Sequence, residues 1–533
     1  MQHARATLVM TARERHSLAD TAIDGVLRAT SQPYRFVYLD VQSPPWLRER
    51  LAGRAAAGQI EVVRFDEPLW PQEARLRFAD AIDTDYVVFL DNDVEVAPGW
   101  LDALVRCADE TGAGIVGPLY LWGDGVRPAT IHMAGGALTE HAAGDRLALE
   151  ETHRLVGSDP AAADLARGPC DYVEFHCMLL RTSLVQGESV LDARLRCVHE
   201  HIDASLGAKR RGYATVLEPA AQVTYLAYAN YRLDELDFFR QRWSPAEGEA
   251  NIATFCRKWN VVDDARSFGG VRAFLRDHLE QVDPLRTASA APRDAPMPSA
   301  ALCQTRSALL EAAALAGYRA DELALITSAY HVAHVLMDGG YRPCGRPFVN
   351  HLVGTASVLV HFGLRAQTVA AGLLHAAYTH SPPHADGARA ALASIRDALG
   401  GAGHAIESRV RAYTLNGTDR VGVRPGDPLS VLQAEIALID AANEIDMHQS
   451  GELRYSGRTD EIGADALARV GEVCAALGLR GLHDTLARAR EDRSSVEAAL
   501  LTGIPSSYRI SADRGSAVTM AVNELTALSD PAF

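Results

Sequence analysis

An apolar run that ends abruptly in two aspartates constrains this chain more than any other feature. The run Tyr86–Leu90 is rich in Val, Phe and Tyr, as buried parallel strands are, and Asp91 and Asp93 come directly after it. Alternate residues of an extended chain share a face, so both carboxylates can point at one hard cation. Because open α/β sheets bind ligands at the carboxyl ends of their strands, the run predicts a Mn²⁺ or Mg²⁺ site there.

The first half of the chain alternates strand-like with helix-like segments. Short apolar segments at Ala6–Thr11, Arg35–Leu39 and Glu61–Phe65 predict further strands. Leu18–Thr30 and Glu73–Ala81 lie between strands and have helical spacing. This alternation predicts an α/β domain over residues 1–285, with a mostly parallel sheet covered by helices.

Near residue 285 the composition and the apolar periodicity of the sequence change. Residues 286–300 are dominated by Pro, Ala and Ser and have no apolar period, which is typical of a linker. Residues 301–533 are rich in Ala and Leu with a period near 3.6, which predicts a second, all-α domain. The predicted helices are Leu302–Gly317, Asp321–Gly339, Val349–Phe362, Ala366–Thr379, Ala388–Leu399 and Leu429–Ile445.

The net charge narrows the classes of partner, and the cysteines, the apolar runs and the N-terminus indicate the compartment. The 533 residues include 52 basic and 68 acidic side chains, a formal net charge of −16, which argues against nucleic acid held by a broad basic surface. The eight cysteines form no Cys-x-x-Cys pair, as expected of reduced thiols in a cytosolic protein. No apolar run approaches the roughly 20 residues that span a bilayer. The N-terminus enters a strand at once, so we expect no signal peptide and a cytoplasmic location.

Several motifs of the first domain resemble those of inverting family 2 glycosyltransferases of the GT-A fold. The matching segments, within roughly residues 5–260, are Thr11–Arg15, Tyr38–Ser43, Ala74–Arg75, Asp91–Asp93, Cys170–Arg181 and Glu200–Asp203. The resemblance implies a nucleotide-sugar donor, most simply a UDP-sugar, and a divalent cation held by Asp91 and Asp93. Asp93 would be the direct ligand, and Asp91 would act through ribose or water. The implied donor-binding residues are Thr11, Arg13, Glu14, Asp40, Arg75, Asp91 and Asn92.

The resemblance also indicates which residues would lie on the acceptor side of the site. A carboxylate must take the proton from the attacking nucleophile, and the motif that supplies it falls at Glu200 and Asp203. The position usually assigned as the base holds His201, so Glu200 is our first choice, with Asp203 and His201 as alternatives. A late histidine of the family is replaced by Tyr225, which leaves the third protein ligand of the cation open. Residues placed near the acceptor are His132, His176 and His201.

The second domain resembles an HD-type hydrolase domain that has lost its chemistry. The pattern falls on His351, His375 and Asp440, but the aspartate expected after the second histidine is Ala376. The acidic pair expected soon afterwards is Thr379 and His380. A hydrolase without those carboxylates lacks a metal ligand and its water-activating groups. Packed core histidines, a residual metal site and surviving hydrolysis are the three interpretations.

Together these patterns predict a metal-dependent inverting glycosyltransferase whose acceptor is a glycan, a peptide or a small natural product. The helical domain would bind the acceptor, form a homo-oligomer or recruit a partner. One alternative is a degenerate nucleotide-sugar sensor or scaffold, which His201 and Tyr225 favour. Another is a nucleotide phosphohydrolase in the second domain, which Ala376, Thr379 and His380 disfavour.

Overall fold

The computed structural model divides the chain into two compact units. It describes residues 4–12, 14–41, 43–123, 129–226, 231–286, 293–342, 344–380, 387–418, 429–455 and 462–491. The first unit runs to Tyr231 and includes Glu235–Leu279, and the second includes Arg232–Asp234 and continues from Glu280. The first unit is α/β and the second is helical.

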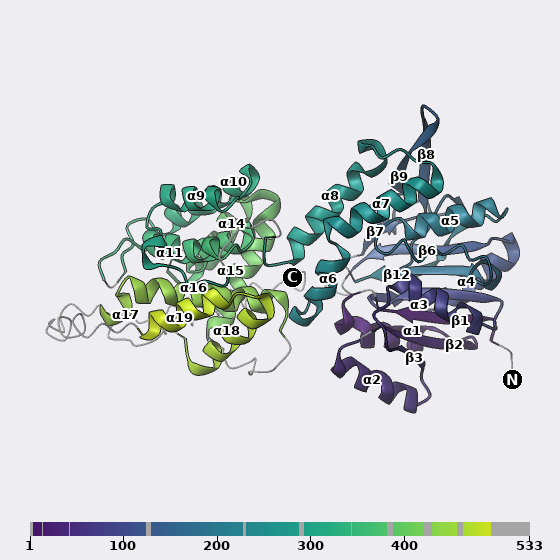
Figure 1. The fold of residues 1–533 in the computed structure, drawn as a ribbon, viewed down its shortest axis with the longest axis horizontal. Coiled ribbons are helices and arrows are strands. Elements are labelled where there is room, and N and C mark those ends of the chain that lie inside the picture. The colour runs from purple at the N-terminus through teal and green to yellow at the C-terminus, as the bar shows by residue number, and fades with distance from the viewer. Residues whose placement is uncertain are drawn as a thin grey trace. The chain divides into compact units, whose positions relative to one another are not determined.

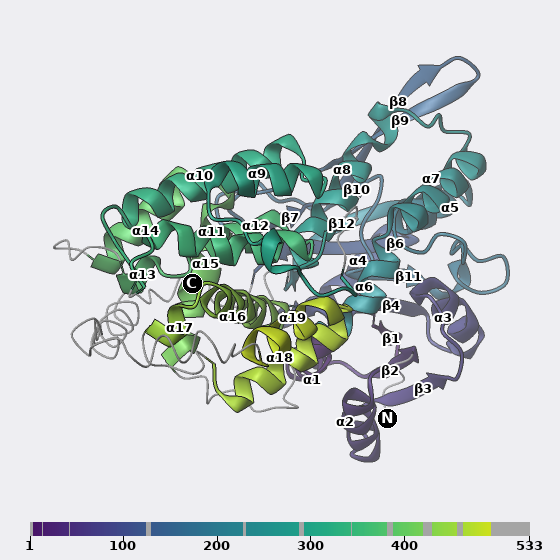
Figure 2. The ribbon, with the colours of Figure 1, turned by 60° about the vertical axis from the view of Figure 1, so that its left-hand side comes forward.

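A ten-stranded sheet forms the centre of the first unit (Figure 1). The strands of this unit are β1 (Ala6–Thr11), β2 (Tyr34–Val41), β3 (Glu61–Phe65), β4 (Tyr86–Asp91), β5 (Val94–Val96), β6 (Ile115–Trp122), β7 (Thr130–Met133), β8 (Gly136–Ala143), β9 (Arg146–His153), β10 (Gly168–Cys170), β11 (Cys177–Arg181) and β12 (Thr215–Tyr225). The order across the sheet is β10-β12-β6-β11-β4-β1-β2-β3, with β5 paired to β12 and β7 to β6. Strands β8 and β9 form a separate hairpin that extends beyond the main sheet in both views (Figures 1 and 2).

The sheet is mixed, which corrects the expectation of a mostly parallel one. Strands β1, β2, β3 and β4 pair in parallel, as predicted, and so do β6 and β12. Strand β11, however, lies antiparallel between β4 and β6. Antiparallel neighbours need no helical crossover between them, so the alternation of strand and helix did not reveal this strand.

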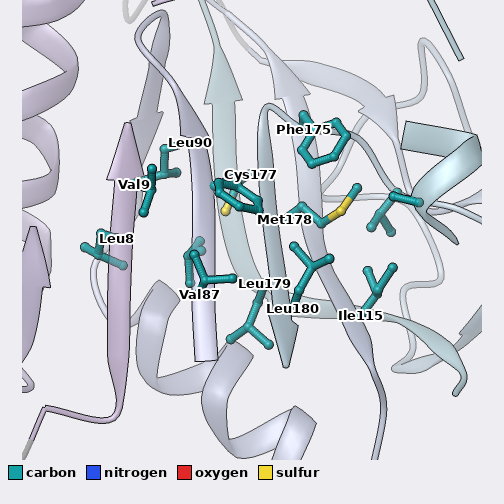
Figure 3. Close-up of a cluster of buried hydrophobic side chains, with 14 of the residues drawn as sticks. Leu8, Val9, Val87, Leu90, Ile115, Phe175, Cys177, Met178, Leu179 and Leu180 are labelled. Carbon is teal, nitrogen blue, oxygen red and sulfur yellow. The ribbon is translucent and has the colours of Figure 1, made fainter. Parts of the chain in front are cut away.

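Apolar side chains at the middle of the sheet form the core of the first unit (Figure 3). Leu8 and Val9 of β1, Leu90 of β4 and Met178 of β11 are fully buried. Such Val- and Leu-rich runs form strands because branched side chains pack well on a pleated surface covered on both faces. The core fixes the strands at whose ends the polar residues lie.

Helices flank the strands of the first unit (Figure 2). They are α1 (Ala19–Ala29), α2 (Pro45–Ala56), α3 (Pro71–Phe78), α4 (Trp100–Thr111), α5 (Glu200–Arg210), α6 (Leu236–Arg242), α7 (Pro245–Trp259) and α8 (Ala265–Val282). Helix α3 begins two residues before the predicted start, at Pro71. Proline suits the first turn of a helix because the missing N–H would have no partner there, and the Glu73 carboxylate accepts from the Trp70 amide at 2.9 Å.

The second unit is built around one long buried helix. Its helices are α9 (Arg306–Leu315), α10 (Ala320–Leu336), α11 (Phe348–His361), α12 (Ala366–Leu374), α13 (Ala377–His380), α14 (Gly387–Ala398), α15 (Gly403–Thr418), α16 (Val431–Gln449), α17 (Glu452–Tyr455), α18 (Ala464–Leu477) and α19 (Arg480–Glu491). Helix α16 is buried over most of its length and packs against α11, α18 and α19. Among the helices of the described residues, none combines the length and the apolar character needed to cross a bilayer.

Residues of the predicted linker make defined contacts within the helical unit. The Arg286 guanidinium is buried and donates to the Glu322 carboxylate. Beyond residues 287–292, which lie outside the described residues, the Met297 amide donates to Thr485 Oγ1 at 2.8 Å. Both described ends of this Pro- and Ala-rich segment are therefore anchored by hydrogen bonds.

Gly354 on α11 should not tolerate a side chain. A Cβ at this position would lie 1.8 Å from Oδ1 of Asp446, which is itself held by His351 and Arg346. We expect Gly354→Ala to destabilise the helical unit by about 1–3 kcal/mol, because the buried ion pair must shift. In α8, a Cβ on Gly270 would meet nothing within 4 Å, so Gly270→Ala should instead stabilise by about 0.5–1 kcal/mol. Thermal unfolding of both variants would check these expectations, and hydrogen exchange of α11 would localise the effect of Gly354→Ala. Equal melting temperatures for Gly354→Ala and the wild type would contradict the clash.

Candidate active site

Two aspartates and a histidine meet at the carboxyl end of β4. Asp91 is the last residue of β4, and Asp93 lies in the turn before β5. Because β11 runs antiparallel to β4, it brings the residue before its start, His176, beside Asp91: Nδ1 of the ring lies 3.1 Å from Asp91 Oδ2. One ligand atom from each of these three side chains lies within 4.8 Å of the others, so they could together hold a metal ion.

The ligand atoms of these three side chains fit a divalent cation such as Mn²⁺. Carboxylate oxygens with one imidazole suit Mn²⁺, whereas Mg²⁺ prefers oxygen alone. Burial raises the pKa of Asp93, and neighbouring Asp91 adds to the effect while Arg15 opposes it. Two close carboxylates in a dry site repel each other, and a cation between them would remove that cost.

The third side chain of this cluster, His176, comes from a part of the chain that the sequence does not connect with the aspartates. The sequence places His176 on the acceptor side and leaves a third ligand for the predicted cation open at Tyr225. The Tyr225 ring instead stacks on the His176 ring, with centroids 4.3 Å apart and an interplanar angle of 21°. The tyrosine therefore packs against the imidazole that faces Asp91.

Arg75 of α3 fixes a positive charge beside the aspartates. Its guanidinium donates to Asp91 Oδ1 at 3.2 Å and lies 4.4 Å from the centre of the Phe175 ring. The side chain is almost fully buried. A buried arginine held by a carboxylate and an aromatic face is preorganised to meet further negative charge.

The loop after β1 is held against the same edge. Thr11 lies opposite Asp91 in the parallel register, and the Asn92 amide donates to the carbonyls of Glu14 and Arg15 at 2.8 and 2.9 Å. Arg15 adopts a left-handed backbone conformation with φ 53°, and its guanidinium lies 4.5 Å from the centre of the Tyr231 ring. Arg15 is not among the site residues predicted from the sequence, and the Leu226 carbonyl and Tyr231 ring that contact its guanidinium lie more than 200 residues away in sequence.

Of the predicted donor-binding residues, Arg13 lies outside the described residues, and Asp40 is held by local contacts. Asp40 follows Leu39 at the end of β2 and is buried; its carboxylate accepts from the Ser43 amide and from Arg64 Nε, both at 2.9 Å. These contacts are those of a turn-forming aspartate.

Glu14 is a buried carboxylate whose charge is stabilised by its neighbours. It accepts from the Tyr231 hydroxyl at 2.8 Å and from Trp243 Nε1 at 2.7 Å. Burial by itself would raise its pKa, but the positive charge of Arg242 and the other nearby groups lowers the pKa from 4.5 to about 2. The charged form is therefore favoured in the folded state.

The stability of the first unit should decrease as the pH is lowered, because Glu14 becomes protonated. A carboxyl whose pKa is lowered by folding contributes stability that is fully present above its unfolded pKa of 4.5 and is lost as the pH falls towards about 2. The shift corresponds to about 3 kcal/mol. We expect Glu14→Gln to be less stable than the wild type at pH 7, with a difference that shrinks on acidification. Denaturant unfolding from pH 7 to pH 3 would check this, with exposed Glu67→Gln as the control; a difference independent of pH would contradict the assignment.

The acidic residues of α5 differ in their surroundings. Asp203 accepts from Lys258 Nζ at 2.9 Å and from Trp259 Nε1 at 2.7 Å. Glu200 begins the helix and is buried. Burial lowers the pKa of His201, and its ring lies 5.4 Å from that of Tyr172. Asp203 therefore has the contacts of a structural anchor.

A second cluster lies beside the first. Nε2 of His132 on β7 lies 2.7 Å from Glu174 Oε2, and Nε2 of His153 on β9 lies 3.6 Å from Glu174 Oε1. Glu174 Oε2 is also 3.6 Å from Nε2 of His176. The sequence singled out His132, but it missed His153 and Glu174, because their positions in the chain follow no common spacing.

In the helical unit, His351 and His375 lie close together. The two rings are 5.2 Å apart. Nδ1 of His351 pairs with Asp446 at 2.7 Å, and Nδ1 of His375 pairs with the Gly372 carbonyl at 2.7 Å. Of the described residues, none in this unit belongs to a group with metal-binding geometry. These are the contacts of hydrogen-bonded core histidines.

One family model matches part of the first unit. Residues 7–183 match the family model Glycosyl transferase family 2. Two solved structures are similar at 14% and 11% identity: GalNAc-T7 with UDP, GalNAc and Mn²⁺, and residues 1–349 of S. aureus TarS with UDP-GlcNAc. Each similarity covers 52% of this chain, against 58% of the GalNAc-T7 chain (TM-score 0.35) and 78% of the TarS chain (TM-score 0.31). No curated protein matches the chain.

Proposed function

From the match of residues 7–183 to family 2 glycosyl transferases, we propose that the first unit transfers a sugar from a nucleotide sugar, a UDP-sugar, to an acceptor with inversion. The observation that carries the proposal is the meeting of Asp91, Asp93 and His176 at the carboxyl end of β4. A divalent cation bound there would offset the negative charge that develops on the leaving diphosphate. The acceptor is a glycan, a peptide or a small natural product.

The residues around the cluster have separate roles in this proposal. Arg75, fixed against Asp91 at 3.2 Å, stabilises the leaving group without having to reorganise. Arg15 adds a second buried cation, anchored by its 2.7 Å bond to the Leu226 carbonyl. Glu200 accepts the proton of the nucleophile, since the oxygens of Asp203 are already held by Lys258 and Trp259.

Nucleoside diphosphate release tests the proposal. The full chain would be incubated with Mn²⁺ and a panel of UDP-, GDP- and dTDP-sugars, and the released diphosphate measured. We expect slow release from one donor by transfer to water, dependent on Mn²⁺ and reduced in Glu200→Gln. Donor binding without release, with or without candidate acceptors, would instead favour the sensor interpretation.

A further inference from the structure

The side chains of His132, His153 and Glu174 come from three separate segments and converge at the base of the β8–β9 hairpin. His132 lies on β7, His153 ends β9, and Glu174 lies in the loop before β11. One ligand atom from each lies within 4.8 Å of the other two. Two imidazoles and one carboxylate are a donor set that proteins use for Zn²⁺ and related transition ions.

The backbone around this cluster is fixed by hydrogen bonds. The Ala134 amide donates to the Arg154 carbonyl at 3.0 Å, and the Arg154 amide donates to Gly135 at 3.1 Å, which holds β7 next to the end of β9. The Tyr120 hydroxyl donates to the Glu174 carbonyl at 2.9 Å. At Gly136, a Cβ would lie 2.2 Å from the Tyr172 ring, so the close approach at the hairpin base requires glycine. Hydrogen bonds thus fix the backbone that carries the three side chains.

The distances within the cluster suit a bound ion. Ligands about 2.1 Å from a tetrahedral ion lie roughly 3.4 Å from one another. The two nitrogen–oxygen separations are 2.7 Å for His132 and 3.6 Å for His153, and each histidine faces a different oxygen of Glu174. Small rotations of the side chains would bring both separations to the required value.

We propose that His132, His153 and Glu174 form a second metal site, distinct from the Asp91, Asp93 and His176 cluster and selective for Zn²⁺. Selectivity follows from the ligands, since two neutral imidazoles favour Zn²⁺ over Mn²⁺ or Mg²⁺, whereas the aspartate pair favours the harder ions.

Glu174 also links the two clusters. Its Oε2 lies 3.6 Å from Nε2 of His176, whose Nδ1 faces Asp91. Histidines that bind metal through one nitrogen commonly present the other to a carboxylate. Removing Glu174 should therefore weaken both sites, whereas removing His153 should affect only the zinc site.

Metal analysis of the full, untagged chain tests the proposal. The protein would be stripped with a chelator, loaded with Zn²⁺, dialysed and measured by atomic emission. We expect one zinc per chain in the wild type and in Asp93→Asn, and none in His153→Ala. His141→Ala is the matched control, because His141 pairs with Glu150 at 3.2 Å in the same hairpin but is partly exposed and belongs to no group with a third ligand among the described residues; it should retain the zinc.

Two further measurements test the site even if one variant fails to fold. Co²⁺ substitution should give the visible absorption of a tetrahedral site in the wild type, and Glu174→Gln should abolish it even if His153→Ala proves unstable. Zinc retained by His153→Ala but lost from Asp93→Asn would place the ion in the first cluster and overturn the proposal. A wild type that retains no zinc would overturn it too.

The role of the site in catalysis rests on the proposed transferase function. Three protein ligands leave a position open, as in catalytic rather than structural zinc sites. An acceptor hydroxyl held there would lose its proton more readily. If zinc has this role, His153→Ala should lower the rate of diphosphate release at least tenfold, leave the KM for the donor unchanged and shift the pH profile. Zinc binding without this kinetic effect would reject the catalytic role and leave the metal site standing.

Discussion

Asp93→Asn should abolish Mn²⁺-dependent release of nucleoside diphosphate while leaving the fold intact. The side chain is buried next to Asp91 and His176, where an amide cannot replace the charge of a carboxylate towards a cation. Loss of several kcal/mol of transition-state stabilisation corresponds to at least about 10²–10³-fold in rate. Release measured at saturating donor and Mn²⁺ would check this.

The stability of the same variant separates a catalytic defect from a folding defect. Burial and the neighbouring Asp91 raise the pKa of Asp93, so its charged form is disfavoured in the folded chain without metal. Replacing it by neutral asparagine should therefore leave the metal-free melting temperature unchanged or raise it. Asp237→Asn is the control, since its side chain is 97% exposed, and it should keep full activity. Unchanged release in Asp93→Asn would rule out the role of this cluster.

Glu435→Gln should be among the most destabilising single changes in the helical unit. Glu435 lies on α16 and accepts from Arg365 Nε at 2.8 Å and from Arg409 Nε at 3.0 Å. Burial would raise its pKa, but Arg365 and Arg409 lower it to about 2. The glutamine would leave two largely buried arginines without their shared counter-charge, which typically costs about 3–5 kcal/mol.

Hydrogen exchange measured by mass spectrometry would localise this effect. Protection should fall in peptides from α12, α15 and α16 and stay unchanged in the sheet of the first unit. Asp484→Asn provides the matched comparison, because its ion pair with Arg480 is exposed, with N···O 3.8 Å, and should contribute less than about 1 kcal/mol. Equal protection in the two variants would show that the buried pair adds nothing to stability.

The sequence by itself determined the strands at the start of the chain and the carboxylates at the end of β4. Both depend on local pattern: branched apolar residues form a buried strand wherever the fold covers both faces, and Asp91 and Asp93 necessarily follow Leu90. Helices α9, α10, α11, α12, α14 and α16 of the second half were predicted for the same reason, since a 3.6-residue apolar period requires only that one face be buried, whereas α15, α17, α18 and α19 were not predicted.

Only the tertiary structure decided which distant residues join the site. His176 meets Asp91 because β11 enters the sheet antiparallel to β4, a pairing that no local pattern encodes. His351 pairs with Asp446 of α16, a residue that the sequence does not single out, and the packing of α16 against α11 brings the two side chains together.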